Sequence, residues 1–351
     1  MHFIRAARPR LAGPGGTVAL LAAILLLAGA ALSPALAQKL RVGVLKLASS
    51  GPVFIAQDKG YFKAEGLDTE LKFFEAAQPV ALAVVSGDID VGVTGLTAGF
   101  YNLAGKGALR IIASQSREEP GYPLIAYLAS KKAHEAGLKS LDDLPGRSVG
   151  TTQVGSTFHY SLGLLAEKRK FDLSRIRLVP LQSIPNMTAA LRGGQVDAAL
   201  VPATAALPLI RSGEAVLLGW VGDETPWQLG AVFTSPKTIA DNRATLQAFM
   251  RAYQKGAQDF YDAFLTKGPD GKPVEGPEAQ NILGILAKYT GQEAAGLRAG
   301  IPYIDPKGRL LVSDIYNQVA WYKSQKLADE GVDAKTILDL SFVEGHFDVP
   351  K

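Results

Sequence analysis

The sequence contains no cysteine, and this absence excludes several kinds of protein at once. Disulfides, a thiol nucleophile and a lipid-modified cysteine after an export signal all require that residue. Histidine is scarce too: after His2, only His134, His159 and His346 occur, and no two stand at metal-ligand spacing. Ser156 lies in VGSTF rather than in G-x-S-x-G, and no triad partner is evident. We therefore predict no enzyme, no metal and no cofactor.

Long apolar runs are also few, and residues 17–32, TVALLAAILLLAGAAL, form the one that stands out. Three arginines precede this run, and the small residues Ala35-x-Ala37 follow it. This order is typical of a secretory signal peptide, so we predict one over residues 1–37, with cleavage after Ala37 and a periplasmic location. The alternative is a retained membrane anchor, but the run is shorter than the roughly 20 residues of a spanning helix.

Little net charge remains once that segment is set aside. Its three arginines account for most of the formal charge of +4, so Lys+Arg falls from 37 to 34 against 33 Asp+Glu. Such a balance gives no reason to expect a nucleic-acid partner or a membrane-surface partner. The remaining length suggests two domains or lobes, and we expect a monomer.

One phrase occurs twice in the chain. SGDIDVGV at 86–93 and GGQVDAAL at 193–200 share the order small residue, Gly, any residue, aliphatic residue, Asp. Asp90 and Asp197 are 107 positions apart, and the same offset brings Val42-Gly43 onto Val149-Gly150. Chance likeness between α/β segments is the alternative. Because one offset holds without a gap from about residue 41 to 111, we interpret the pattern as a structural repeat.

Each copy alternates predicted strands with predicted helices. The strands are 40–45, 70–74, 89–93 and 109–114 in the first copy, and 148–152, 178–181, 196–201 and 216–221 in the second. The main helices are 52–64 and 79–86, matched by 156–169 and 186–193. This alternation predicts an α/β fold with parallel strand pairing and two similar Rossmann-like lobes.

The segments around the second copy suggest how the lobes are connected. Extended apolar runs at 122–130 and 230–235 predict two crossings between lobes, which together make a hinge. We place lobe 1 at 38–128 and 233–351, and lobe 2 at 129–232. Apolar residues at three- and four-residue steps over 246–264 predict a helix that covers lobe 1. Further helices are expected at 277–289 and 313–328.

The best binding signal is QVGSTFHY at 153–160. Gly155 permits a sharp turn, and Ser156 and Thr157 then supply hydroxyls and amides at a helix start, where unpaired N–H groups and the helix dipole attract an anion. The alternative is that Ser156 merely caps its own helix. The matching segment LASSGPVF brings Ala48, Ser49 and Ser50 to the equivalent strand end. Both segments point to the sheet edge where open α/β folds hold ligands.

Other candidates follow neighbouring strands. Arg117 would pair with a carboxylate or sulfonate, although pairing with Glu118 or Glu119 is equally compatible with the sequence. His159 is interpreted as a residue on the helix face, with contact to the ligand as the alternative. Trp227 is a candidate to pack a ligand's apolar part, whereas Trp220 is interpreted as core. The remaining candidates are Thr94, Gly95, Thr97, Gln115 and Thr204.

Several longer phrases resemble a known family. They are FIAQDKGYFKAEGLDTEL at 54–71, SGDIDVGVTG at 86–95, LDDLPGRSVGTTQVGSTFHY at 141–160, ALRGGQVDAALV at 190–201 and VDAKTILDLSFVEGHF at 332–347. The chain resembles type II periplasmic solute-binding proteins of ABC importers, of the subfamily for aliphatic sulfonates, taurine, nitrate and thiamine-precursor pyrimidines. The resemblance implies a hinged two-lobe fold, one small-molecule ligand in the cleft, and delivery to an inner-membrane permease.

The resemblance also has a departure and two competing functions. Many relatives carry a Trp and an acid after the DAALV phrase, whereas this chain has Val201-Pro202-Ala203-Thr204, so an amine-bearing ligand such as taurine loses an obvious partner. A small organic anion is thus the expected ligand. One alternative is a ligand-sensing subunit of a membrane signalling system. The other is an enzyme related to thiamine-pyrimidine synthesis, which the lack of cysteine disfavours.

Overall fold

The computed structural model describes residues 1–2 and 38–348, so the predicted signal peptide and its cleavage site lie outside the described residues. The chain divides into residues 1–37 and 38–351, and every described strand and helix belongs to the second of these units. Within the described part, no helix is both long and apolar enough to cross a membrane.

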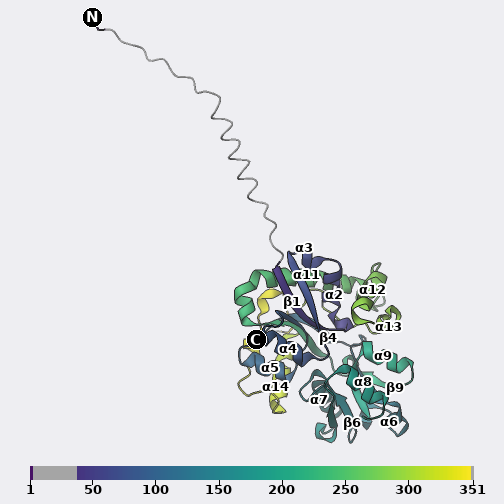
Figure 1. The fold of residues 1–351 in the computed structure, drawn as a ribbon. Coiled ribbons are helices and arrows are strands. Elements are labelled where there is room, and N and C mark those ends of the chain that lie inside the picture. The colour runs from purple at the N-terminus through teal and green to yellow at the C-terminus, as the bar shows by residue number, and fades with distance from the viewer. Residues whose placement is uncertain (3–37, 349–351) are drawn as a thin grey trace. The chain divides into compact units, whose positions relative to one another are not determined.

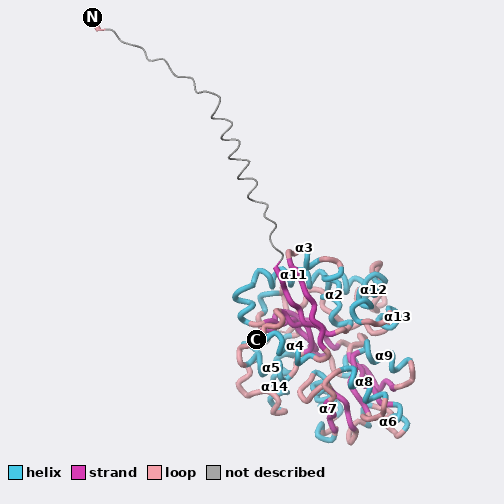
Figure 2. Tube along the Cα trace, viewed as in Figure 1, coloured by secondary structure: helices cyan, strands magenta, loops and turns pink. Residues whose placement is uncertain are grey.

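Residues 38–348 contain two five-stranded sheets (Figure 1). The first has the order β2-β1-β3-β10-β4 and the second β7-β6-β8-β5-β9. Figure 2 shows helices around both groups of strands. The first sheet comprises β1 (Gln38–Leu45), β2 (Leu67–Phe74), β3 (Val91–Gly95), β4 (Arg110–Glu118) and β10 (Trp227–Thr234). The second comprises β5 (Ile125–Ser130), β6 (Ser148–Thr151), β7 (Arg177–Pro180), β8 (Ala198–Pro202) and β9 (Ala215–Trp220).

The helices follow the same division. Beside the first sheet are η1 (Ala48–Ser50), α2 (Gly51–Asp58), α3 (Tyr61–Ala64), α4 (Ala77–Ser86) and α5 (Ala98–Gly105). The second sheet carries α6 (Lys131–Glu135), η2 (Leu141–Asp143), α7 (Thr157–Arg169), η3 (Leu173–Arg175), α8 (Ile184–Arg192), α9 (Ala203–Arg211) and α10 (Val221–Glu224). The chain then forms α11 (Pro236–Phe264), α12 (Ala279–Thr290), α13 (Ala294–Arg298), α14 (Val312–Ser324), α15 (Ala334–Ile337) and η4 (Leu340–Phe342).

The predicted pair of similar α/β sheets is confirmed, and the offset of the repeat reappears in the strand register. Val42 pairs with Leu71 and Val91 in the first sheet. The matching residue Val149 pairs with Leu178 and Ala198 in the second. The expectation of parallel pairing is wrong for one strand in each sheet. β10 pairs antiparallel with β3 and β4, and β5 pairs antiparallel with β8 and β9.

The repeated aspartate has the same structural role in both sheets. Asp90 Oδ2 accepts a hydrogen bond of 2.7 Å from the backbone amide of Arg41, in strand β1 of the first sheet. Asp197 Oδ2 accepts one of 2.8 Å from the amide of Ser148, the equivalent residue in β6 of the second sheet. A strand amide left without a partner costs free energy, so each carboxylate stabilises its own sheet. The repeated phrase is therefore a scaffold feature.

The crossings between the sheets lie close to the predicted positions but not at them. β5 lies wholly in the second sheet and β10 wholly in the first. We therefore propose crossings at 119–124 and 221–226, in place of boundaries after residues 128 and 232. The two-lobe division of the chain stays a proposal.

Two helices differ from the prediction for local reasons. The helix expected over 52–64 is interrupted because Gly60 has a φ of 73°, which ends α2 and lets α3 begin. The long helix α11 has non-helical dihedrals at Asn242. Its apolar face lies against α2 so closely that a Cβ at Gly256 would lie 2.2 Å from the Pro52 carbonyl oxygen. Burial of Phe249, Tyr253 and Phe260 fixes this contact.

Candidate functional site

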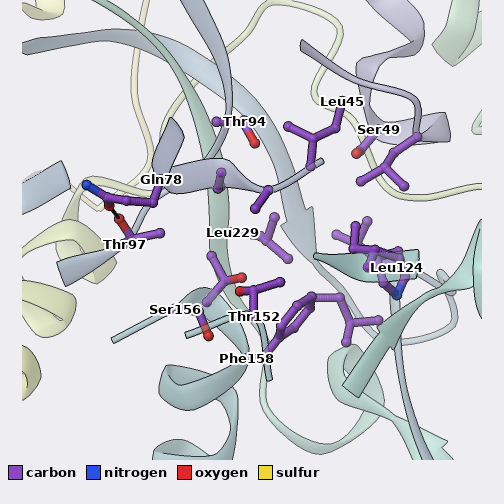
Figure 3. Close-up of a pocket in the computed structure, with 18 of the residues that line it drawn as sticks. Leu45, Ser49, Gln78, Thr94, Thr97, Leu124, Thr152, Ser156, Phe158 and Leu229 are labelled. Carbon is purple, nitrogen blue, oxygen red and sulfur yellow. Dashed lines mark hydrogen bonds between the residues drawn. The ribbon is translucent and has the colours of Figure 1, made fainter. Parts of the chain in front are cut away.

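A cavity lies where strand ends of the two sheets meet (Figure 3). The centres of water-sized molecules can occupy about 50 Å³ of it, so the enclosed space is narrow in this structure. Within the described part of the chain, no Asp, Glu, Lys, Arg or His lines it. Much of the wall is apolar: Leu45, Leu47, Ala76, Ala77, Leu124, Ile125, Phe158, Ile184, Pro202 and Leu229.

The first turn of α7 forms one wall. Gly155 precedes it with a φ of 78°, a conformation that favours glycine. Ser156 Oγ accepts a hydrogen bond of 3.4 Å from the His159 amide and lies 2.7 Å from Thr151 Oγ1. Ser156 thus caps its own helix, and its contact with a ligand stays a prediction. The amides of Thr157 and Phe158 have no acceptor inside the helix, and both residues line the cavity. They place two donors and the positive end of a helix dipole at the cavity wall.

The first sheet contributes hydroxyls and amides held in fixed positions. Thr97 Oγ1 accepts a hydrogen bond of 3.0 Å from the Phe100 amide, which caps α5, and donates one to Gln78 Oε1 (Figure 3). Gln115 Nε2 donates to the Ser49 carbonyl at 3.1 Å. Both glutamine side chains are therefore largely engaged within the protein. Ser49 and Thr94 are each 4% exposed, and both side chains line the cavity.

The two sheets touch directly beside the cavity. The Ala98 amide, at the start of α5, donates a hydrogen bond of 2.8 Å to the Gly155 carbonyl. A Cβ at Gly95 would lie 2.8 Å from Thr157 Cγ2, so the β3 end and the α7 start are in van der Waals contact. A further backbone hydrogen bond of 3.5 Å joins the Ile184 amide to the Glu75 carbonyl. These contacts join the two sheets' helices and loops across the edge of the cavity.

Seven of the predicted site residues line the cavity: Ser49, Thr94, Gly95, Thr97, Gln115, Ser156 and Thr157. Gly155 shapes the α7 turn without lining it. Ala48 and Ser50 are buried in η1, where Ser50 Oγ donates to the Leu45 carbonyl at 2.9 Å. Thr204 lies inside α9 and is 4% exposed, away from the cavity wall.

Arg117 is placed outside the cavity. Its guanidinium carbon lies 4.7 Å from the centre of the Tyr303 ring and 4.6 Å from that of Phe347. The same side chain forms an ion pair of 3.4 Å with Glu119. The Arg117 charge was predicted to pair with an anionic ligand. In the structure it is engaged in cation–π contacts and an ion pair within the protein. Its role as a ligand contact stays a prediction to which this placement gives no support.

His159 and Trp227 are buried beside the cavity rather than in its wall. His159 Nδ1 accepts a hydrogen bond of 3.1 Å from the Gly155 amide. Burial lowers the pKa of His159 to about 4, so its ring is neutral at pH 7. Trp227 is fully buried, with its ring centre 4.8 Å from that of Tyr160 in an edge-to-face arrangement. Both residues support the α7 start from behind.

Several lining residues were not predicted. Leu124 and Ile125 lie in the run 122–130, which was interpreted only as a crossing, and Leu229 directly precedes the second such run, 230–235. They reach the cavity because β5 and β10 are inserted among the inner strands of the sheets. Ile184 was identifiable, since the repeat offset matches it to Ala77, another lining residue. The other missed residues are Leu45, Leu47, Ala76, Ala77, Gln78, Thr152, Gln153, Phe158 and Pro202.

Two matched α/β sheets with a cavity at their strand ends are the architecture of the periplasmic binding protein fold. The sequence profile described as NMT1/THI5 like matches residues 48–263, more than half of the chain, and the chain belongs to this family. The taurine-binding periplasmic protein of Escherichia coli (strain K12) is 26% identical over 278 residues, which cover 77% of this chain and 80% of that protein. The predicted resemblance to periplasmic binding proteins of ABC importers is thereby confirmed.

Solved structures support the fold. The alkanesulfonate-binding protein SsuA from Xanthomonas axonopodis pv. citri, bound to MOPS, has a TM-score of 0.69 at 20% identity and covers 86% of this chain and 98% of its own. The desulfurization enzyme DSZB has a TM-score of 0.57 at 13% identity, covering 87% of this chain and 97% of its own. Binding proteins and an enzyme thus share this architecture. Among the described residues, no group of three or more His, Cys, Asp or Glu could hold a metal ion.

Proposed function

We propose that this protein captures a small organic anion, such as a sulfonate or carboxylate, and delivers it to the permease of an ABC importer. The proposal is supported above all by the first turn of α7, whose Thr157 and Phe158 amides face a cavity without acidic side chains. Helix starts of this kind bind anions through N–H donors and the helix dipole. The anionic group would lie there, beside the Thr157 hydroxyl.

The rest of the cavity favours an apolar ligand body. Leu45, Leu124 and Leu229 face the space opposite α7 (Figure 3). Burying the apolar surface of a ligand against such walls contributes roughly 25 cal/mol per Å². Any ammonium group would enter without a carboxylate partner, which carries a large desolvation cost. We therefore propose a simple organic anion in preference to taurine.

The lack of any cationic side chain in the wall favours a second candidate, an uncharged ligand with one hydrogen-bonding group. The two candidates differ in what happens when the negative charge is removed. An anion gains from the α7 dipole, whereas a neutral group of the same shape gains only hydrogen bonds. A sensing role would use the same binding chemistry, and catalysis has no support from the lining residues.

Matched pairs of compounds test these alternatives by calorimetry and thermal shift. Taurine differs from ethanesulfonate by an added amine. Benzamide differs from benzoate by loss of the charge and by an NH2 donor in place of one acceptor oxygen. We expect ethanesulfonate to bind at least tenfold more tightly than taurine, and benzoate more tightly than benzamide. Preferential binding to the folded state raises the melting temperature. Tighter binding of the amide would replace the anion by the neutral candidate, and binding of neither class would overturn the proposal.

The transport role has its own test. Deletion of the gene, in the organism's own genome, should abolish import of the binding compound at low concentration. Complementation with the Thr157→Pro variant, which removes one amide of the α7 turn, should not restore it. Proline suits the first helical position, so the helix itself should survive. Normal import in the deletion strain would favour the sensing role instead.

A further inference from the structure

Helix α14 contacts elements of both sheets, although it follows the first sheet's last strand in the chain. It packs against α5 and β10 on the first sheet and against α7 on the second. Asp314, in its first turn, is 7% exposed and joins three of these elements. Its Oδ2 accepts hydrogen bonds from the Gln228 amide at 3.0 Å and from Gln318 Nε2 at 2.7 Å. Its Oδ1 accepts one of 3.3 Å from the Tyr160 hydroxyl, on α7.

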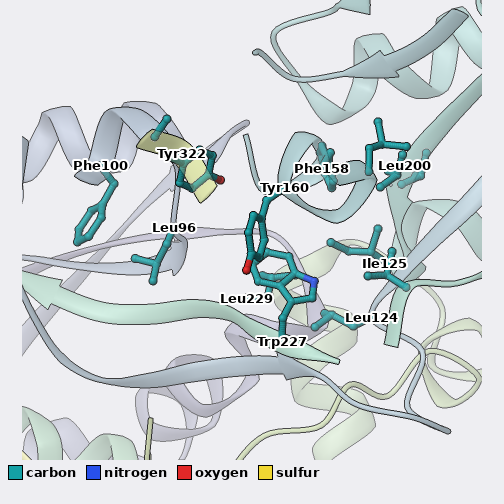
Figure 4. Close-up of a cluster of buried hydrophobic side chains, with 14 of the residues drawn as sticks. Leu96, Phe100, Leu124, Ile125, Phe158, Tyr160, Leu200, Trp227, Leu229 and Tyr322 are labelled. Carbon is teal, nitrogen blue, oxygen red and sulfur yellow. The ribbon is translucent and has the colours of Figure 1, made fainter. Parts of the chain in front are cut away.

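The last turns of α14 also pack against α7. A Cβ at Gly163 of α7 would lie 2.2 Å from Trp321 Cζ2, so the indole ring lies directly on the glycine. The Tyr322 hydroxyl donates a hydrogen bond of 3.2 Å to the Ser156 carbonyl, next to the cavity. Figure 4 shows Tyr160 against Trp227, with Tyr322 nearby on α14. The centres of the Tyr160 and Tyr322 rings are 5.8 Å apart.

These contacts bear on closure because α7 carries the wall of the cavity. Its first turn lines the cavity, and the Gly155 carbonyl before it accepts the Ala98 amide of the first sheet. Any rotation that separates the sheets must move α7 either with α14 or against it. Movement against α14 strains the Asp314–Tyr160 hydrogen bond and the Trp321–Gly163 contact.

We propose that Asp314, Tyr160, Gly163 and Trp321 are positioning residues that hold the closed arrangement and so set ligand affinity without touching the ligand. The inference rests on the proposed function, since it assigns these residues a part in solute capture. Packed interfaces of this kind have discrete arrangements, so a small displacement of one helix shifts the population of closed molecules.

The test is Gly163→Ala, which adds one methyl group beneath the Trp321 ring and leaves every cavity residue unchanged. Gly284→Ala is its matched control, because Gly284 also lies in a helix and a Cβ there would meet nothing within 4 Å. Trp321→Phe in the Gly163→Ala background makes room for the methyl group and should restore the original behaviour. Tyr160→Phe removes only the hydroxyl and tests the Asp314 hydrogen bond if Gly163→Ala folds poorly.

Closure is measured without ligand by labelling. Because the sequence has no cysteine, Lys63→Cys on the first sheet's side and Arg175→Cys on the second's give the only two thiols. We expect Gly163→Ala to lengthen the distance between the two fluorophores and Gly284→Ala to leave it unchanged. With ethanesulfonate and benzoate as probes, the dissociation constant should rise about tenfold in Gly163→Ala and about threefold in Tyr160→Phe.

The outcomes separate this inference from the proposed function. Unchanged distances in both Gly163→Ala and Tyr160→Phe would overturn the positioning role, even if an acid binds. A changed distance in a protein that binds none of the acids would retain the positioning role and remove the proposed ligand class. A changed distance that Trp321→Phe does not restore would also contradict the inference, because it would point to general disruption of α7.

Discussion

The helix after the first strand begins differently in the two sheets. In the second sheet, Gly155 turns the chain, Ser156 caps α7, and two amides remain for the cavity. In the first sheet, the short helix η1 comes before α2, Ser50 makes no side-chain cap, and Pro52 occupies the first turn. A proline carries no N–H, so α2 has fewer donors to offer. The anion site that we propose therefore belongs to one half of the repeat.

The helix after the third strand shows the reverse. Thr97 caps α5 and lines the cavity in the first sheet. Its match in the repeat, Thr204, lies inside α9, which begins after Pro202 without a side-chain cap. The scaffold repeats down to the aspartate that holds β1 and β6, and matched positions such as Ser49 and Ser156 line the cavity in both halves. The copies differ in how their helices begin, so the cavity wall is not symmetric.

The largest expected effect concerns His159. The repeat offset matches this residue to Pro52 in the first half, so only the second half has a histidine here. Burial lowers the pKa of His159 to about 4 in the folded state, against 6.5 for an ordinary histidine. The unfolded chain therefore takes up a proton first as the pH falls. His159 contributes stability above pH 6.5 that is lost towards pH 4, by about 3 kcal/mol. His159→Gln keeps an acceptor for the Gly155 amide and should remove this loss.

Asp314 acts in the opposite direction over the same range. Burial raises its pKa from 3.8 to about 6, so its contribution is full below pH 3.8 and lost as the pH rises through 6, again by about 3 kcal/mol. The free energy of unfolding, measured with urea between pH 4.5 and 7, tests both assignments. Relative to the original protein, His159→Gln should gain stability as the pH falls towards 4.5, whereas Asp314→Asn should gain stability as the pH rises towards 7. Slopes of the same sign in the two variants would contradict the assignment.

A second prediction tests whether the halves share one scaffold. Asp90→Ala and Asp197→Ala each leave a strand amide without its acceptor, and each should lower the free energy of unfolding by about 2 kcal/mol. Asp88→Ala, on an exposed side chain of the same phrase, is the control and should change it little. Ligand affinity should stay within twofold, because neither aspartate lines the cavity. If only one of the two variants lost stability, the two aspartates would not contribute equally to the free energy of unfolding.

The repeat could be predicted because similar residues recur at a constant offset in the sequence. Asp90 and Asp197 follow glycines at one offset, and that offset places the β1 and β6 registers correctly. The insertion of β5 and β10 could not be predicted, because strand pairing between distant segments leaves no mark in local composition. Arg117 is a similar case. Its partners Tyr303 and Phe347 are remote in the chain, so the sequence offered only the neighbouring glutamates.

Part of the site was predictable for a physical reason. Gly155, Ser156 and Thr157 specify a turn and a cap through their own chemistry, and the structure has both. Leu124 and Leu229 look like any buried strand residues in sequence, and only the crossing of the chain brings them to the cavity. Polar contacts with a local cause were therefore easier to predict than the apolar wall.

The smallest expected effect distinguishes the two serines that the repeat pairs, Ser49 and Ser156. Both line the cavity, but only Ser156 accepts a helix amide. Ser156→Ala should lower the free energy of unfolding by about 1 kcal/mol, the usual cost of a lost cap. Ser49→Ala should lower it less than Ser156→Ala does, because the Ser49 side chain caps no helix. Chemical denaturation at pH 7 measures both.

The same pair of variants also tests how the anion is held. If backbone amides bind it, Ser156→Ala should weaken benzoate binding only as far as the α7 start loosens, by about threefold or less. Restoring the cap with Ser156→Asp should then recover stability, because aspartate is a good cap, but abolish anion binding through like-charge repulsion. Stability and affinity would thus move apart at one position. If Ser156→Asp still bound benzoate as tightly as the original protein, the anionic group could not lie at the start of α7.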